Sequence, residues 1–273
     1  MTNPVDGSLE GKVAIITGGA SGIGAATARR FASRGARLML ADLNTEGLSA
    51  VAKEIGGDSD SVATRTTDVG DRHQVEALTE AAVERFGRLD IVFNNAGIGT
   101  YGQTPDLDPD AWHRIIDVDL HAVFYGCRAA IPHLRKSGGG SIINTASISG
   151  LYGDYGLAAY NAAKGALVNF TKALAIDHAR ENIRVNAVCP GAIETGLTAP
   201  LRANEALMRE YAKLIPMGRM GRPEEIADLV AFLASDAATY ITGSAIVIDG
   251  GLTAATGQPN FTRFLEESRE ESA

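Results

Sequence analysis

A tyrosine and a lysine one helical turn apart are the residues of this chain best suited to chemistry. Tyr160 and Lys164 share one face of a segment with helical periodicity, and Ser147 leads into that segment. An ammonium about 5 Å from a phenol is worth about 3 kcal/mol at an effective dielectric constant of about 20, which would lower the phenol pKa toward about 8. Such a phenol could remove a hydroxyl proton as hydride leaves the same carbon, while Ser147 holds the substrate oxygen by a hydrogen bond. The alternative is a buried tyrosine beside a lysine that extends to solvent.

A glycine-rich turn, residues 17–24, is the second feature that indicates chemistry. It follows the apolar run 13–16 directly and opens into a helical pattern over residues 25–33. Its glycines permit a tight turn, a close approach to a pyrophosphate and close packing of the helix on the strand. The pattern predicts a dinucleotide-binding turn with the anion at the helix N-terminus.

Asp42 indicates which dinucleotide binds. It ends a second apolar run and lies 18 residues after Gly24, where a carboxylate accepts from the adenosine ribose and repels the 2′-phosphate of NADP. No lysine or arginine stands in the turn or directly after Asp42, so we predict NAD as the cofactor. The alternative is that Asp42 only begins a loop and caps the helix that starts near Asn44.

The composition restricts the partners of the chain. Its 273 residues are 45% hydrophobic, with a formal net charge of −8 and a pI of about 5.2. This charge, with no basic cluster longer than two residues, disfavours nucleic acid and anionic membranes as partners. No apolar targeting segment opens the chain and no run approaches the ~20 apolar residues of a membrane span, so we expect a cytoplasmic protein.

We expect neither disulfides nor a metal site. Cys127 and Cys189 are too few for a disulfide framework and cannot form a Cys-x-x-Cys site, so we predict that they are core residues. The histidines form no close-spaced ligand motif.

Seven apolar runs of strand length alternate with segments of helical periodicity. Alternating strands and helices require crossover connections and a parallel sheet that is covered on both faces, which also explains why the runs are continuously apolar. We therefore predict an α/β fold in a single domain, with a doubly wound, seven-stranded parallel sheet of the Rossmann type. The predicted strands cover residues 13–17, 37–42, 61–67, 90–94, 141–145, 183–189 and 245–248.

The predicted domain covers residues 1–256 and is followed by a tail, residues 257–273. Within the domain, residues 191–222 form the longest part without a strand, and we name them the lid because a helical piece at 201–214 is suited to cover a cleft. The glutamate-rich tail either frays or packs against another subunit.

From about Leu9 to Gly251 the chain resembles the short-chain dehydrogenase/reductase family, in its subtype of roughly 250 residues, a length typical of one domain. The family's Thr-Gly-x-x-x-Gly-x-Gly occurs at residues 17–24, its Asn-Asn-Ala-Gly at 94–97, its Tyr-x-x-x-Lys at 160–164 and its Pro-Gly at 190–191. The resemblance implies an oxidoreductase that transfers hydride between NAD(H) and a secondary alcohol or ketone. Homotetramers are common in this family, and we expect one here.

The resemblance also implies the roles of individual residues. Ser147, Tyr160, Lys164 and Asp119 form the expected catalytic set. Asp68 and Val69 would contact the adenine, Asn94 and Gly97 would pack beside the cofactor, Ile193 and Thr195 would hold the carboxamide, and Lys164 would also bind the nicotinamide ribose. The expected cofactor-binding residues are Gly18, Ser21, Gly22, Ile23, Gly24, Asp42, Asp68, Val69, Asn94, Ala96, Gly97, Tyr160, Lys164, Pro190, Gly191, Ile193 and Thr195.

Asp119 departs from the family pattern, which has an asparagine in the helix after the fourth strand. The family uses the backbone carbonyl of this residue to hold a water in a proton relay to the lysine, and any residue offers a carbonyl. An ionised carboxylate would tighten the charge of Lys164 and oppose its effect on Tyr160. We predict an active enzyme with a pH profile displaced to alkaline values, unless the carboxyl is protonated or paired.

The residues expected near the substrate are largely apolar, and we find no anchor for a carboxylate or phosphate, so we predict a neutral secondary alcohol or ketone. One alternative is an enzyme like the 3-ketoacyl-carrier-protein reductases, which normally use NADPH and a basic docking patch. Another is a catalytically silent NAD-sensing protein, which would be expected to lose Ser147, Tyr160 or Lys164. The expected substrate residues are Ile98, Tyr101, Leu151, Tyr155, Leu157, Ile193, Leu197, Leu207, Met208 and Tyr211.

Overall fold

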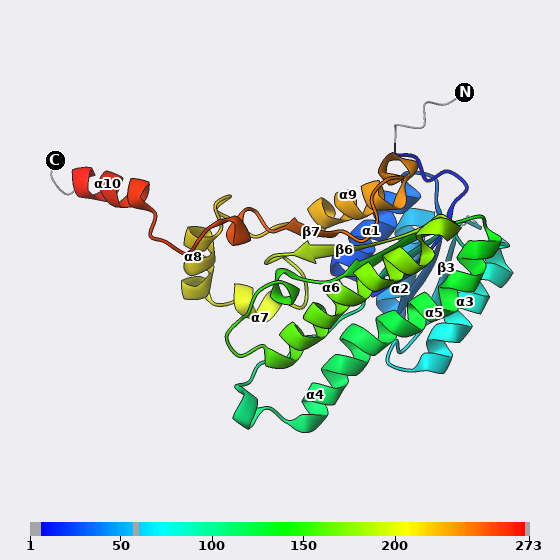
Figure 1. Ribbon diagram of the computed structural model, residues 1–273, viewed down its shortest axis with the longest axis horizontal. Helices are drawn as coiled ribbons and strands as arrows, with labels where there is room; N and C mark the ends of the chain where they lie inside the picture. The colour runs from blue at the N-terminus through cyan, green and yellow to red at the C-terminus, as the bar shows by residue number, and fades with distance from the viewer. Residues whose placement is uncertain (1–6, 57–59, 271–273) are drawn as a thin grey trace.

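Seven parallel strands form one sheet in the computed structural model, which describes residues 7–56 and 60–270 (Figure 1). The strand order is β3-β2-β1-β4-β5-β6-β7. Each predicted strand is confirmed to within one residue at either end, as is the doubly wound, single-domain Rossmann fold. The strands are β1 (Val13–Thr17), β2 (Arg37–Asp42), β3 (Val62–Thr66), β4 (Ile91–Asn94), β5 (Gly140–Thr145), β6 (Ile183–Pro190) and β7 (Ala245–Ile248).

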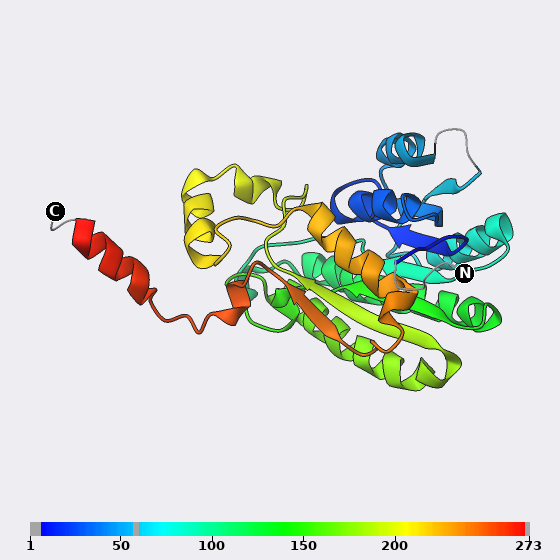
Figure 2. The same cartoon turned by 90° about the horizontal axis from the view of Figure 1, so that it is seen from above.

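Helices connect the strands and cover both faces of the sheet (Figures 1 and 2). A π-helical turn, Asp117–His121, joins α4 to α5. The helices are α1 (Gly22–Ala32), α2 (Thr45–Gly56), α3 (Arg72–Phe86), α4 (Pro109–Ile116), α5 (Ala122–Lys136), α6 (Ala158–His178), α7 (Ala199–Arg202), α8 (Glu205–Leu214), α9 (Pro223–Ala234) and α10 (Phe261–Glu270).

Alternate residues of each central strand belong to two separate hydrophobic cores. In β1, Val13 and Ile15 pack with residues of α3, α5 and α6, whereas Ala14 and Ile16 pack with residues of α1, α2 and α9. Both sets are at most 2% exposed. Burial on both faces is the reason that the strands are continuous apolar runs.

The chain reverses its direction of winding between β1 and β4. From β1 it moves outward to β2 and β3, then returns to place β4 on the other side of β1 and continues to β7. Loops that leave the carboxyl ends of β1 and β4 diverge at such a switch point, and this opens a crevice for a ligand. The glycine turn after β1 and the loop after β4 form its walls.

The lid contains two helices, so the prediction of one helical piece at 201–214 was wrong in this respect. Asn204 separates α7 from α8 with an extended backbone, and its side-chain oxygen accepts from the N–H of Leu207 at 3.1 Å. An asparagine cap of this kind satisfies a free amide and begins a new helix.

The tail forms α10, which lies away from the sheet and its covering helices in both views (Figures 1 and 2). Phe261, Phe264 and Leu265 on this helix are exposed. The boundary at residues 256 and 257 stays a prediction. Within the described residues, no helix combines the length and apolar character that a bilayer crossing requires.

Candidate active site

The glycine turn has the backbone that its sequence predicts. Gly18 and Gly22 adopt positive φ angles of +67° and +52°, which a side chain would disfavour. Gly24 serves packing, because a Cβ atom there would collide with the carbonyl of Gly18. The first turn of α1 is thereby held directly after the end of β1.

Hydrogen bonds between β1 and the β4 loop fix the position of this turn. The hydroxyl oxygen of Thr17 accepts from the backbone N–H groups of Asn95 and Ala96, at 2.9 and 3.1 Å. The side-chain amide of Asn95 donates to the carbonyl of Thr17 at 3.1 Å. We did not predict a role for Asn95, although its place in the 94–97 motif at the end of β4 was a usable signal.

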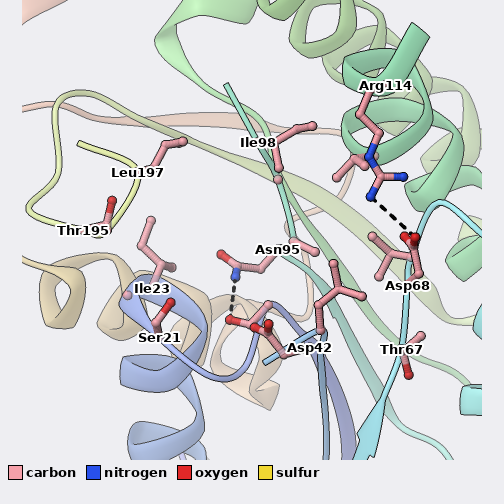
Figure 3. A pocket seen from close by; sticks show the side chains of 18 residues that line it. Ser21, Ile23, Asp42, Thr67, Asp68, Asn95, Ile98, Arg114, Thr195 and Leu197 are labelled. Atoms are coloured by element: carbon pink, nitrogen blue, oxygen red, sulfur yellow. Dashed lines mark hydrogen bonds and ion pairs between the residues drawn. The ribbon is translucent and has the colours of Figure 1, made fainter. Parts of the chain in front are cut away.

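A cavity of about 430 Å³ lies between the glycine turn, the ends of β2 and β3 and the β4 loop (Figure 3). We call it the nucleotide cavity. It brings together ten of the residues expected to bind the cofactor: Gly18, Ser21, Gly22, Ile23, Asp42, Asp68, Val69, Ala96, Gly97 and Thr195.

The chemistry of this cavity fits a dinucleotide. The side chain of Ser21, at the N-cap of α1, makes no capping hydrogen bond, and the first turn of α1 contains no acidic residue. Gly22 and Ile23 of that turn line the cavity. Unsatisfied N–H groups and the positive end of a helix dipole favour a pyrophosphate at this position.

Asp42 lines the same cavity and organises the backbone around it. Its two carboxylate oxygens accept from the N–H groups of Ala20 and Asn44, at 3.1 and 3.0 Å. The alternative that Asp42 caps the next helix was wrong, because Asn44 accepts from the N–H of Gly47 and supplies that cap. The remaining acceptor capacity of the Asp42 carboxylate is available at the cavity wall.

Arg114 faces this cavity from α4 and was not predicted (Figure 3). Its guanidinium lies 3.5 Å from the carboxylate of Asp68, which follows β3. Thr67 and Val118 also line the cavity. Asp68 and Arg114 are 46 positions apart in the sequence, and no sequence pattern indicates that they meet.

Two residues expected at the cofactor do not line a cavity described here. Gly24 packs against the carbonyl of Gly18 and lines neither cavity. Asn94 is 5% exposed, and its amide donates to the side-chain oxygen of Asn144 at 2.9 Å, tying β4 to β5 inside the sheet. Their expected cofactor roles stay predictions, and their visible roles are structural.

A second cavity, of about 740 Å³, lies beneath the lid, and we call it the substrate cavity. Ile23, Gly97, Thr195 and Leu197 line both cavities, so the two adjoin. The second cavity brings together all four expected catalytic residues and the rest of the expected cofactor set: Ser147, Tyr160, Lys164, Asp119, Pro190, Gly191 and Ile193.

Helix α6 positions the tyrosine and the lysine. The ammonium of Lys164 lies 5.5 Å from the ring centre of Tyr160 and donates to the carbonyl of Thr145, at the end of β5, at 2.9 Å. Gly150 allows the turn after Ser147 to pack against α6, because a Cβ there would lie 2.5 Å from the carbonyl oxygen of Lys164. This packing holds Ser147 at the wall of the substrate cavity, which Tyr160 also lines.

Asp119 forms a buried ion pair with Lys164. One carboxylate oxygen lies 3.1 Å from the ammonium, and the other accepts from the N–H of Ile98 at 2.9 Å. Asp119 is fully buried and Lys164 is 3% exposed. The π-helical turn, a rare conformation that is frequent at functional sites, carries Asp119 to this position.

The electrostatics of Tyr160 differ from our expectation. Burial raises the pKa of the Tyr160 phenol above its usual value and outweighs the ammonium of Lys164, which lowers it. The Asp119 carboxylate raises this pKa further, while a hydrogen bond with Ser147 lowers it. Asp119 also raises the pKa of Lys164, against the opposite effect of burial. The prediction that the phenol pKa is lowered was therefore wrong for the protein without cofactor, because desolvation was left out, whereas Asp119 opposes the effect of Lys164 in the predicted direction.

The substrate cavity contains seven of the ten residues that we expected near the substrate. Ile98 lines the nucleotide cavity instead, and Leu151 and Met208 line neither. Arg202 and Arg209 lie outside the substrate cavity, so they offer no anchor for an anion there. Residues at this cavity that we did not predict include Tyr152, Asp154, Glu210, Leu214 and Thr253.

The cysteines are unsuited to nucleophilic chemistry. Both are free and fully buried, and burial raises the pKa of Cys127 to about 12 and that of Cys189 to about 11. Across the described residues, no three histidine, cysteine, aspartate or glutamate side chains are grouped to hold a metal ion.

Comparisons with known proteins show what the chain is similar to. A family model described as enoyl-(acyl carrier protein) reductase matches residues 18–253. The chain is 42% identical to a meso-2,3-butanediol dehydrogenase of Serratia marcescens, over 92% of this chain and 98% of that protein. It is also 42% identical to a cyclohexanol dehydrogenase of Acinetobacter sp. (93% and 99% covered) and to a 3-oxoacyl-[acyl-carrier-protein] reductase of Thermotoga maritima (89% and 98% covered).

A solved structure shares the fold. The crystal structure of levodione reductase superposes with a TM-score of 0.85 at 39% identity, covering 90% of this chain and 99% of that one.

Proposed function

The chain belongs to the short-chain dehydrogenase/reductase family, and on that premise we propose that it is an NAD-dependent dehydrogenase of neutral secondary alcohols. The observation that carries this proposal is the meeting of Ser147, Tyr160 and Lys164 in a cavity that adjoins the nucleotide cavity. The largely apolar wall of the substrate cavity supports a neutral, alicyclic or aliphatic substrate. Relatives named for cyclohexanol and butanediol act on alcohols of this class.

The residues present would hold NAD along the carboxyl edge of the sheet. The first turn of α1 would bind the pyrophosphate, Asp42 the adenosine ribose, and Asp68 and Val69 the adenine. Lys164 would bind the nicotinamide ribose, and Ile193 and Thr195 the carboxamide. The bound cofactor supplies a hydride acceptor and a positive charge that favours the tyrosine phenolate.

The protein residues complete the reaction by moving the proton. Ser147 holds the substrate oxygen, and the phenolate oxygen of Tyr160 takes the hydroxyl proton as the carbon gives up its hydride. Lys164 stabilises the phenolate. In the reverse direction, Tyr160 returns the proton to the ketone oxygen.

Turnover of simple alcohols tests this function directly. We expect cyclohexanol and meso-2,3-butanediol to be oxidised with NAD, and cyclohexanone to be reduced with NADH, each followed by nicotinamide absorbance. NADP should be a much poorer cofactor for the same alcohols. No turnover of either alcohol with either nucleotide would contradict the proposal.

Replacing Asp42 should change the nucleotide preference. Asp42→Asn removes the charge that repels a 2′-phosphate, so the ratio of kcat/KM for NAD over NADP should fall by about 100-fold, given about 4 kcal/mol between unit charges 4 Å apart at an effective dielectric constant of about 20 and partial screening. Glu46→Gln, an exposed carboxylate on α2 outside the cavity, is the matched control and should leave the ratio unchanged. An equal change in both variants would contradict a specific role for Asp42.

Replacing Asp119 should displace the pH profile. Asp119→Asn keeps an oxygen that accepts from the N–H of Ile98 but removes a charge that raises the pKa of Tyr160. Oxidation needs the phenolate, so its rate rises as the pH passes the Tyr160 pKa. A lower pKa moves that rise to lower pH. We expect the rising limb of kcat/KM in this variant to lie at lower pH than in the wild type; an unchanged limb, or one moved to higher pH, would rule out the electrostatic role.

Two alternatives give different results in the same assays. An enzyme like the carrier-protein reductases would prefer NADPH and reduce an acetoacetyl thioester faster than cyclohexanone. The chain is 42% identical to one such reductase, so the assays include this thioester. An NAD-sensing protein would bind NAD in calorimetry without turnover. The presence of Ser147, Tyr160 and Lys164 at one cavity favours catalysis over sensing.

We also propose a cytoplasmic homotetramer, which rests on the family resemblance and the composition. Light scattering should then give about four times the chain mass of 28.5 kDa. A monomeric mass would contradict this assembly.

A further inference from the structure

Four tyrosines line the substrate cavity besides Tyr160: Tyr101, Tyr152, Tyr155 and Tyr211. The first three are exposed, by 64%, 57% and 104%, so they lie toward solvent, away from the buried end at Lys164. Tyr211 belongs to α8 of the lid. Asp154 lines the same cavity, next in sequence to Tyr155.

The solvent-facing part of the substrate cavity, where these tyrosines lie, carries a negative charge. Lys164 is the one basic residue among the described residues of the cavity wall, and its charge is paired with Asp119 at 3.1 Å. Glu210 is paired with Lys213 at 2.8 Å. No ion pair among the described residues involves Asp154.

The structure holds Asp154 close to the reacting residues. The side-chain amide of Asn161, directly after Tyr160 on α6, donates to the Asp154 carboxylate at 3.3 Å and to the carbonyls of Ser149 and Tyr152 at 2.8 and 2.7 Å. The charge of Asp154 raises the pKa of both Tyr160 and Tyr211. Both tyrosines line the substrate cavity, one on α6 and one on the lid, so the charge of Asp154 acts on two parts of the cavity wall.

From this geometry, and resting on the proposed dehydrogenase function, we propose that Asp154 determines charge specificity. Among analogues that carry a charge at the end opposite the hydroxyl, the cavity accepts a positively charged alcohol, such as an amino alcohol, better than one that carries a carboxylate. The carboxylate attracts an ammonium and repels an anion. Exposed tyrosine faces add a favourable interaction with a cation but none with an anion.

Three substrates that share the cyclohexanol ring and differ at C4 test this proposal: 4-aminocyclohexanol, cyclohexanol and 4-hydroxycyclohexanecarboxylate, each with NAD near neutral pH and low salt. We expect kcat/KM for the amino alcohol to exceed that for the carboxylate by at least about 10-fold, and cyclohexanol serves as the neutral reference. Salt should reduce this ratio, because it screens exposed charges.

Variants test whether Asp154 causes the preference for the amino alcohol over the carboxylate. Asp154→Asn should lower the ratio of amino alcohol to carboxylate by about 10-fold, and Asp154→Glu should retain most of it. Asp177→Asn, a carboxylate elsewhere on α6 and outside the cavity, is the matched control and should leave the ratio unchanged. Each ratio compares two substrates in the same variant. An effect of the substitution on Tyr160 that is common to both substrates therefore cancels.

The outcomes separate this inference from the function on which it rests. If cyclohexanol is oxidised but the wild-type ratio is near one, or survives in Asp154→Asn, the charge-specificity role is wrong and the dehydrogenase function stands. If no member of the series is oxidised with NAD or NADP, both are overturned.

Discussion

Tyr160→Phe is expected to lower kcat for alcohol oxidation by about 1,000-fold, within the range of about 10²–10⁴ that positioned acid–base groups contribute. The substitution removes only the hydroxyl that accepts the proton, so the ring still fills its place on α6. Binding of NAD should change little, because the residues proposed to bind the pyrophosphate and the adenosine ribose line the nucleotide cavity. Stopped-flow measurement of NADH formation and calorimetry of NAD binding check the two parts.

Tyr211→Phe is the control for this variant, since it removes a phenol from the same cavity but on the lid. We expect its kcat to fall by less than about 10-fold. Retention of more than about a tenth of the wild-type kcat in Tyr160→Phe would contradict acid–base catalysis by Tyr160.

Lys164→Met is expected to impair both activity and stability. Without the ammonium, burial and Asp119 raise the pKa of Tyr160 with no opposing charge from the protein, so kcat should fall by about 100-fold or more. The variant also leaves the Asp119 carboxylate buried without its partner, which should cost about 3 kcal/mol in the free energy of unfolding. Denaturant unfolding and initial rates measure the two losses.

A second substitution separates these losses. In Lys164→Met combined with Asp119→Asn, no charge remains buried at this position, so most of the lost stability should return. Activity should stay low, because no cation stabilises the phenolate. If the double variant regained activity together with stability, the lysine would act only as a structural partner of Asp119.

The strands and the glycine turn could be predicted because their signals are local. Burial on both faces produces continuous apolar runs, and the positive φ angles of Gly18 and Gly22 require a residue without a side chain. The spacing of Tyr160 and Lys164 placed both on one helical face. These features need only a few neighbouring residues to be recognised.

Contacts that depend on how loops and helices pack could not be predicted in this way. The approach of Arg114 to Asp68 depends on where α4 lies relative to the loop that follows β3. The position of Asp154 at the substrate cavity depends on the hydrogen bonds that Asn161 makes across a loop. Neither follows from local periodicity, because both are set by tertiary packing.

The Tyr160 pKa was predicted in the wrong direction for a physical reason. A pair of charges can be read from a sequence, whereas the loss of solvation depends on the whole surrounding structure. Asp119 was recognised as a departure from the family pattern, and the structure shows that its carboxylate pairs directly with Lys164. This pair makes the charge on the cofactor more important for forming the phenolate.

The pH dependence of a single turnover tests the central claim most directly. NAD-saturated wild-type enzyme is mixed with cyclohexanol, and the rate of NADH formation is followed across the pH range, with Tyr160→Phe measured beside it. We predict that the wild-type rate rises with one ionisation, and that the variant is slow and shows no such rise. The same rise in both proteins would show that another group accepts the proton and would contradict the account.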